Sequence, residues 1–154
     1  MVFSELSLTS CGVFEYSLDS IYKIKMMDPN DFKDYKDTFI LSAQKNLQSL
    51  KDALGKLQST PSDKNSINTA YIAAHSLKGE CYAMGFINTS SACEKIEKLF
   101  LGLKDTNSSA SQALLQTVQK ALSEIQASIQ SIQVSDKEND LTSVVDELSK
   151  QLSL

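Results

Sequence analysis

The stretch AAHSLKGECYAMGF, residues 73–86, holds the only histidine of a chain of 154 residues. If the stretch is helical, with about 100° between successive side chains, His75 points away from an apolar side of the same helix. That apolar side is formed by Ile67, Ala70, Ala74, Leu77, Cys81 and Met84. The pattern therefore predicts a helix over residues 63–84 that packs one side into a core and presents His75 to solvent.

The residues around His75 make an unusual solvent-facing surface. Gly79 lies one turn after the histidine, and a glycine inside a helix costs about 1 kcal/mol relative to alanine, which indicates that something approaches the imidazole closely. Lys78 puts an ammonium beside the ring, where it can neutralise an arriving anion. We expect an accessible imidazole nucleophile, framed by an apolar docking patch of Ile72, Tyr82 and Phe86. If the helix rolls, Tyr82 and Phe86 instead belong to the core.

The pentapeptide HSLKG at 75–79, with Gly85 ten residues after the histidine, resembles the motif of histidine-containing phosphotransfer (HPt) domains of two-component signalling. The tripeptide MGF at 84–86 and the two alanines before His75 are most similar to the N-terminal phosphotransfer domains of CheA-type chemotaxis kinases. The resemblance covers roughly residues 28–133. It implies an all-α fold, an antiparallel four-helix bundle, and a phosphoryl group carried on Nε2 of His75.

The same resemblance implies a role for a carboxylate on the following helix. In CheA-like domains a glutamate 22 residues after the histidine holds the ring, and here that position is Glu97. A carboxylate that accepts the Nδ1 proton fixes the imidazole and leaves the Nε2 lone pair directed outward. Three positions earlier, where the family usually has a second histidine, this chain has Glu94. Glu94 is therefore a second candidate for the hydrogen-bond network around His75.

The chain has no sequence motif for activating a phosphoryl donor. It contains no Gly-rich phosphate loop, no Walker A motif and no metal-binding acidic cluster, so we expect a phosphoryl carrier without an ATP site, metal or cofactor of its own. By resemblance, the missing groups come from a partner. That partner is a histidine kinase catalytic domain that loads His75, or a response-regulator receiver domain that supplies Mg²⁺ and an aspartate.

Composition restricts the setting in which the chain works. A net charge of −4 and 15 basic residues that are all lysines argue against nucleic acid as a partner. No apolar run approaches about 20 residues, so we expect no membrane insertion. Three cysteines without CxxC spacing favour a reduced, cytoplasmic protein over a disulfide framework. We expect it to be a monomer.

Apolar periodicity and turn residues divide the chain into three parts. Residues 1–27 alternate apolar and polar side chains like a strand and form an N-terminal arm, extended or disordered, to which we assign no function. Residues 28–133 form the four-helix bundle, in which the third helix begins at Asn88 or Ser91 and the fourth covers 109–133. Residues 134–154 add a short amphipathic helix that packs on the bundle.

Two other interpretations remain open at this point. The chain can be the excised phosphotransfer domain of a larger CheA-like chemotaxis kinase, in which case it is a substrate module of that kinase. It can also be a helical adaptor in which the motif has decayed. A docking test separates the adaptor from a working relay, because an adaptor binds receiver domains without taking up phosphate.

Overall fold

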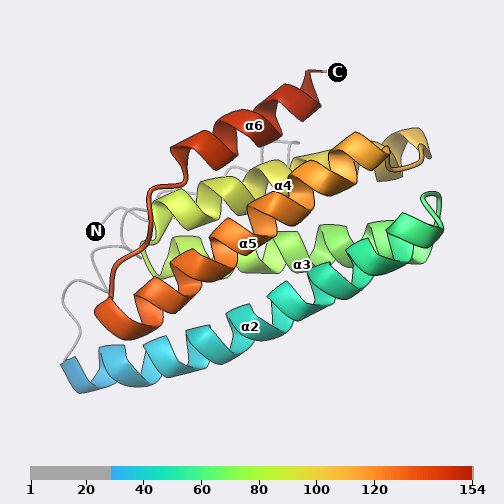
Figure 1. Cartoon of the computed structure of the whole chain (residues 1–154). Helices are drawn as coiled ribbons and strands as arrows, with labels where there is room; N and C mark the ends of the chain where they lie inside the picture. The colour runs from blue at the N-terminus through green and yellow to red at the C-terminus, as the bar shows by residue number, and fades with distance from the viewer. Residues whose placement is uncertain (1–28, 154) are drawn as a thin grey trace, which may run out of the picture.

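The computed structural model describes residues 29–153, and these residues form five α-helices and no strand. The helices are α2 (Pro29–Ser59), α3 (Lys64–Ala83), α4 (Ile87–Thr106), α5 (Gln112–Ser135) and α6 (Thr142–Leu152). Short turns join the first four, which run alternately up and down as a bundle (Figure 1). The all-α bundle with an additional C-terminal helix is thus confirmed, whereas the strand-like pattern of residues 1–27 lies outside the described residues.

One hydrophobic core holds the four long helices together. Around the bundle α2 contacts α3 and α5, and α4 contacts α3 and α5. Each buried Leu, Ile or Phe side chain contributes roughly 1.5–3 kcal/mol relative to an exposed one. The largest fully buried side chains are Leu50, Leu57, Leu77, Ile96, Phe100, Leu115, Leu122, Ile125, Ile129, Ile132, Leu141 and Leu148.

The helix that carries the histidine begins and ends as its sequence predicts. The carboxylate of Asp63 accepts a hydrogen bond from the backbone N–H of Ser66 at 3.0 Å and so caps α3. At the other end Gly85 has φ of 81°, a left-handed conformation that favours glycine and that turns the chain into α4.

The start of α4 differs from the prediction. The helix begins at Ile87, without a side-chain cap from Phe86, rather than at a cap on Asn88 or Ser91. Its first free N–H groups are satisfied by Glu138 of the loop between α5 and α6. The carboxylate of Glu138 accepts from the backbone N–H of Asn88 at 3.0 Å and of Thr89 at 2.8 Å. The cap therefore comes from a residue about fifty positions away in the chain, which local pattern reasoning does not find.

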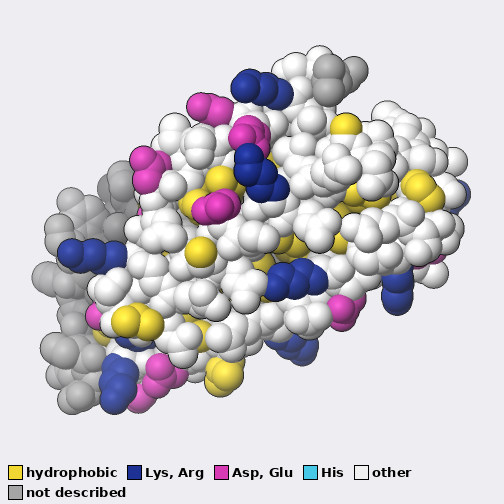
Figure 2. Space-filling view, in the orientation of Figure 1, with side chains coloured by type: hydrophobic (Ala, Val, Ile, Leu, Met, Phe, Trp, Pro, Cys, Tyr) yellow, Lys and Arg dark blue, Asp and Glu magenta, His cyan; other side chains and the backbone are white. Residues whose placement is uncertain are grey.

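The short helix α6 lies across α4 and α5 (Figure 1). Val144 and Leu148 are its buried residues, and Leu141, just before it, is buried as well. On the face shown in Figure 2, lysine and acidic side chains are interspersed and apolar side chains surface as small separate patches. None of the described helices is both long and apolar enough to cross a bilayer.

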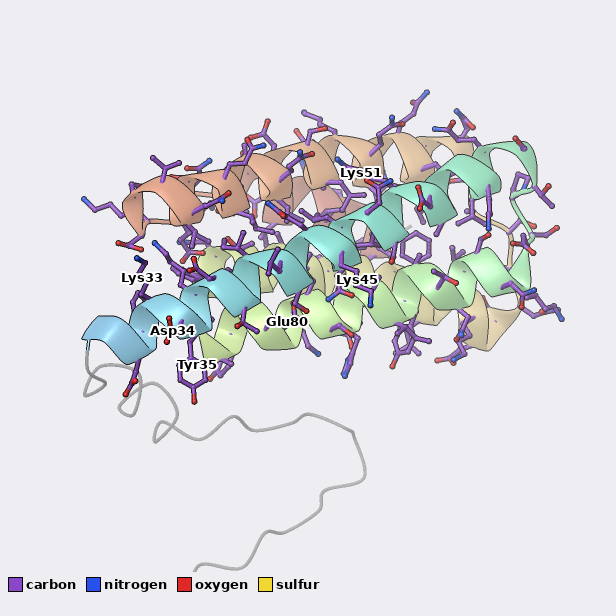
Figure 3. All side chains as sticks on the ribbon, turned by 90° about the horizontal axis from the view of Figure 1, so that it is seen from below. Lys33, Asp34, Tyr35, Lys45, Lys51 and Glu80 are labelled. Carbon is purple, nitrogen blue, oxygen red and sulfur yellow. The ribbon has the colours of Figure 1, made fainter. Side chains whose placement is uncertain are left out.

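A polar contact joins α2 and α3 on the face seen in Figure 3, where Glu80 projects from α3 toward α2. Its Oε1 atom accepts hydrogen bonds from Ser42 Oγ at 2.5 Å and Asn46 Nδ2 at 3.1 Å. Its Oε2 atom is buried and has no hydrogen-bond partner within the described part of the chain. This carboxylate therefore depends on its two α2 donors.

Candidate functional site

His75 is presented to solvent by the middle of α3. Its side chain is 52% exposed, while its neighbours Ala74 and Leu77 are fully buried in the core. This difference follows from the helical spacing, because the two apolar residues face the bundle and the histidine does not. Since α3 is anchored in the core by these residues, the imidazole is accessible on a rigid element.

The imidazole is held from α4. Its Nδ1 atom lies 2.6 Å from Oε1 of Glu97, whose side chain is only 11% exposed. An ionised carboxylate only accepts hydrogen bonds, so this contact assigns the ring proton to Nδ1. The lone pair of the neutral ring then lies on Nε2, the nitrogen that Glu97 does not occupy. The structure thus brings together the two residues predicted to form this pair.

Lys78 binds the same carboxylate rather than standing free beside the ring. Its Nζ atom lies 2.6 Å from Oε2 of Glu97, and its side chain is 24% exposed. One carboxylate therefore holds the imidazole with one oxygen and the ammonium with the other. Gly79 lies within α3 one turn after His75 and is partly exposed.

The predicted docking patch is only partly present. Ile72 is exposed, at 52%, and Tyr82 is partly buried. The prediction that Phe86 is exposed is wrong, because its side chain is only 7% exposed and its ring centroid lies 5.6 Å from that of Phe39 on α2. The left-handed turn at Gly85 directs Phe86 into the core instead of continuing the surface of α3.

Glu94 does not join the histidine. Its carboxylate forms an ion pair with Lys98 at 2.8 Å, one turn further along α4. The hydrogen bond from Lys98 also holds the pKa of the Glu94 carboxyl below its usual value. Among the described contacts none joins Glu94 to His75, so the expectation that it takes part in the histidine network is corrected. The Glu94 carboxylate is thus taken up by a lysine one turn along its own helix.

Two residues near the histidine were not predicted. The ring centroid of Tyr71 lies 6.1 Å from that of His75, and the Nζ atom of Lys104 on α4 lies 5.0 Å from the Tyr71 centroid. The position of Tyr71, one turn before His75, would have drawn attention to it. The sequence gives no comparable signal for Lys104, which reaches Tyr71 from the other helix.

The described residues contain no group of three or more His, Cys, Asp or Glu side chains that could hold a metal ion. Cys81 and Cys93 are unoxidised and buried between α3 and α4. A hydrogen bond with Cys93, together with burial, raises the pKa of the Cys81 thiol well above its usual value. Both residues therefore behave as small core side chains.

The bundle and the site together define a class of protein. An exposed imidazole whose Nδ1 is fixed by a buried carboxylate, on the flank of a helical bundle, is suited to carry a group on Nε2. A family model described as the Hpt domain matches residues 34–128. The chain belongs to the Hpt domain family, and its role is histidine phosphotransfer in two-component signalling.

Two curated relatives are proteins of chemotaxis. The chain is 26% identical over 114 residues to the chemotaxis protein CheA of Halobacterium salinarum, a match that covers 73% of this chain and 17% of the relative. It is also 26% identical over 102 residues to the chemotaxis protein CheA of Bacillus subtilis, covering 66% of this chain and 15% of the relative. The chain spans about one sixth of the length of these relatives.

Proposed function

We propose that the chain carries a phosphoryl group on Nε2 of His75, between a histidine kinase or receiver-domain aspartate and a response regulator. The observation that supports this most is the contact of 2.6 Å between Nδ1 of His75 and Oε1 of Glu97 beside an imidazole that is half exposed. It leaves a nucleophilic nitrogen facing solvent in a fixed orientation.

The chemistry follows from the two ring nitrogens. The Nε2 lone pair attacks phosphorus, an N–P bond forms, and the P–O bond to the donor breaks, with its electron pair leaving on the donor's oxygen. The ring keeps its proton on Nδ1 and becomes cationic. Glu97 stabilises that positive charge through the existing hydrogen bond. Transfer to an acceptor carboxylate reverses these steps.

The ammonium of Lys78 neutralises part of the negative charge of the phosphoryl group. Once the ring is cationic, Glu97 interacts more strongly with His75, and the ammonium of Lys78 can turn toward the phosphoryl oxygens. The side chain is partly exposed and lies one turn from His75, so this exchange needs no movement of the backbone. Gly79 keeps the adjoining surface clear of a side chain, so that the donor can approach.

We assign Mg²⁺ and the rest of the transfer machinery to the partner. The two carboxylates near this site are engaged, Glu97 by His75 and Lys78 and Glu94 by Lys98. Mg²⁺ usually requires carboxylates that remain available to it. We therefore propose that the chain is a carrier and substrate rather than an enzyme, and that it works as a cytoplasmic monomer.

A second candidate role is that of a substrate module within a larger chemotaxis kinase. It is favoured by the two CheA relatives, of which this chain matches only 15–17%. In that role a kinase catalytic domain on the same polypeptide loads His75. The geometry at His75 and Glu97 serves both roles, whereas a helical adaptor would need neither the hydrogen bond nor the exposed nitrogen.

The test is phosphorylation of the purified chain and of His75→Gln. Each is incubated with labelled phosphoramidate, with phosphorylated receiver domains, or with a CheA-type catalytic fragment and Mg-ATP. We expect acid-labile, alkali-stable label on the wild type and none on the variant. Wild-type protein that stays unlabelled by every donor, with the helical circular dichroism spectrum intact, would favour the adaptor.

A further inference from the structure

Two lysines near His75 are paired with carboxylates of α4. Lys78 binds Glu97 at 2.6 Å, and Lys98 binds Glu94 at 2.8 Å. Each ion pair has no net charge, and each places its cation against a carboxylate of α4. These pairs therefore give an approaching protein little electrostatic attraction at a distance.

Lys104 differs from these lysines. The described residues include no ion pair of Lys104, and its Nζ atom instead lies 5.0 Å from the centroid of the Tyr71 ring. The face of an aromatic ring attracts a cation but brings no countercharge, so the ammonium is restrained without being neutralised. Asp105, the next residue, projects about 100° further around α4.

The position of Lys104 follows from the antiparallel packing of α3 and α4. It lies two turns after Glu97 on the same face of α4, while Tyr71 lies one turn before His75 on α3. Tyr71 is close to both, with its ring centroid 6.1 Å from that of the imidazole. Lys104 therefore stands at the rim of the surface centred on His75.

We propose that Lys104, restrained by Tyr71, is a docking residue for a partner protein that presents carboxylates around its own phosphoryl site. This inference rests on the proposed function. Proteins hold the Mg²⁺ of phosphoryl transfer with carboxylates, so the surface that approaches His75 is acidic. An unneutralised cation at the rim accelerates the encounter with such a surface and favours one orientation. Tyr71 is the positioning residue for this cation.

The test is the kinetics of transfer from the phosphorylated full chain to purified receiver domains that accept label from the wild type. We expect Lys104→Gln to raise KM for the receiver roughly three- to fivefold and Lys104→Glu roughly tenfold, with kcat within about twofold. The dependence of kcat/KM on ionic strength should weaken in both variants, because a long-range attraction is lost. Loading of His75 by phosphoramidate, which needs no docking, should not change.

Tyr71 variants test the positioning role. Tyr71→Phe retains the ring face and should leave KM unchanged, whereas Tyr71→Leu should raise it as Lys104→Gln does. The double variant Tyr71→Leu/Lys104→Gln should have a KM no higher than that of either single variant, because the two residues act as one unit. Lys120→Gln is the control for charge, since Lys120 lies on α5 and binds Glu147 of α6 at 3.0 Å.

Three results would overturn the docking role. Lys104 variants that match Lys120→Gln would show that the cation is not used. A fall in kcat at unchanged KM would place Lys104 on the phosphoryl group instead. If neither phosphoramidate nor any receiver labels His75, the proposed function fails and the docking role fails with it. In the first two results His75 still takes up label, so they leave the proposed function standing.

Discussion

His75 and Lys78, three residues apart on α3, bind the two oxygens of a single carboxylate, that of Glu97 on α4. The imidazole and the ammonium therefore compete for one negative charge. When the ring becomes cationic on phosphorylation, this competition shifts toward the ring. On the proposed mechanism, Lys78 would then be free to turn toward the phosphoryl group on His75.

Replacement of Glu97 is expected to impair transfer through the orientation of the ring. Glu97→Gln removes the negative charge that supports the cationic imidazole. Loss of the carboxylate that orients a metal-bound histidine costs roughly ten- to a hundredfold in activity, and we expect an effect of that order here. The rate of labelling by phosphoramidate measures this effect without a protein partner. Glu94→Gln is the matched control on the same helix, and we expect its rate to stay within about twofold of the wild type. Equal labelling rates for Glu97→Gln and Glu94→Gln would show that Glu97 has no role in the transfer.

The cap that Glu138 provides for α4 is expected to make a measurable contribution to stability. Glu138→Gln weakens hydrogen bonds to the backbone N–H groups of Asn88 and Thr89, and the expected loss is about 1–3 kcal/mol of unfolding free energy. Urea denaturation measures the loss, and hydrogen exchange should rise first at the start of α4. Glu147→Gln breaks only an exposed pair with Lys120 and should cost below about 0.5 kcal/mol. Similar losses in the two variants would contradict the capping role.

The Ser42 side chain is expected to contribute more to the free energy of unfolding than its neighbours on α2, because its hydroxyl donates a hydrogen bond to Glu80. Ser42→Ala removes the donor at 2.5 Å from Glu80 Oε1, leaving Asn46 as the donor that remains. We expect a loss of about 1–2 kcal/mol in thermal or urea denaturation. Ser49→Ala is the control, since among the described residues the Ser49 hydroxyl donates only to the Lys45 carbonyl of its own helix. A smaller loss for Ser42→Ala than for Ser49→Ala would refute this assignment.

The cap on α3 should make stability depend on pH in acid. Hydrogen bonds from the side chain and backbone of Ser66 lower the pKa of Asp63 from its usual 3.8. A lowered folded-state pKa contributes stability that is present above pH 3.8 and is lost as pH falls through the folded value. The difference between the urea-denaturation midpoints of the wild type and of Asp63→Ala should therefore become smaller below pH 3.8. A difference that stays constant to pH 2 would show that ionisation of Asp63 adds nothing.

The fold could be predicted from sequence wherever short-range patterns determine it. The helical spacing of apolar residues predicted a helix over 63–84, and the structure has α3 at Lys64–Ala83, because the cap at Asp63 and the turn at Gly85 are local features. The start of α4 was missed because its cap is Glu138, a contact between distant segments. The burial of Phe86 was offered only as an alternative, since a helical wheel does not show where the chain turns after the helix ends.

The features of the site also fall into those that the local sequence predicts and those that depend on contacts between helices. The spacing of His75, Lys78 and Gly79 is a local feature. Glu97 was predicted from the resemblance to a family in which the number of residues between the histidine and this glutamate is characteristic. That Lys78 binds Glu97, that Glu94 binds Lys98 and that Lys104 lies over Tyr71 depend on side-chain choices among several neighbours. The packing of α3 against α4 determines which neighbour each side chain contacts. The sequence of either helix alone does not show that packing.

The antiparallel hairpin of α3 and α4 has a consequence for how partner choice can change. The residues proposed for chemistry or docking all lie within residues 71–104. Helices α2, α5 and α6 supply buried surface, and the loop between α5 and α6 supplies the cap on α4. The outward positions of one hairpin can therefore be exchanged between homologues without repacking the interior. A chimera that grafts these positions onto another bundle should acquire the donor's preference for receivers while keeping the host's melting behaviour.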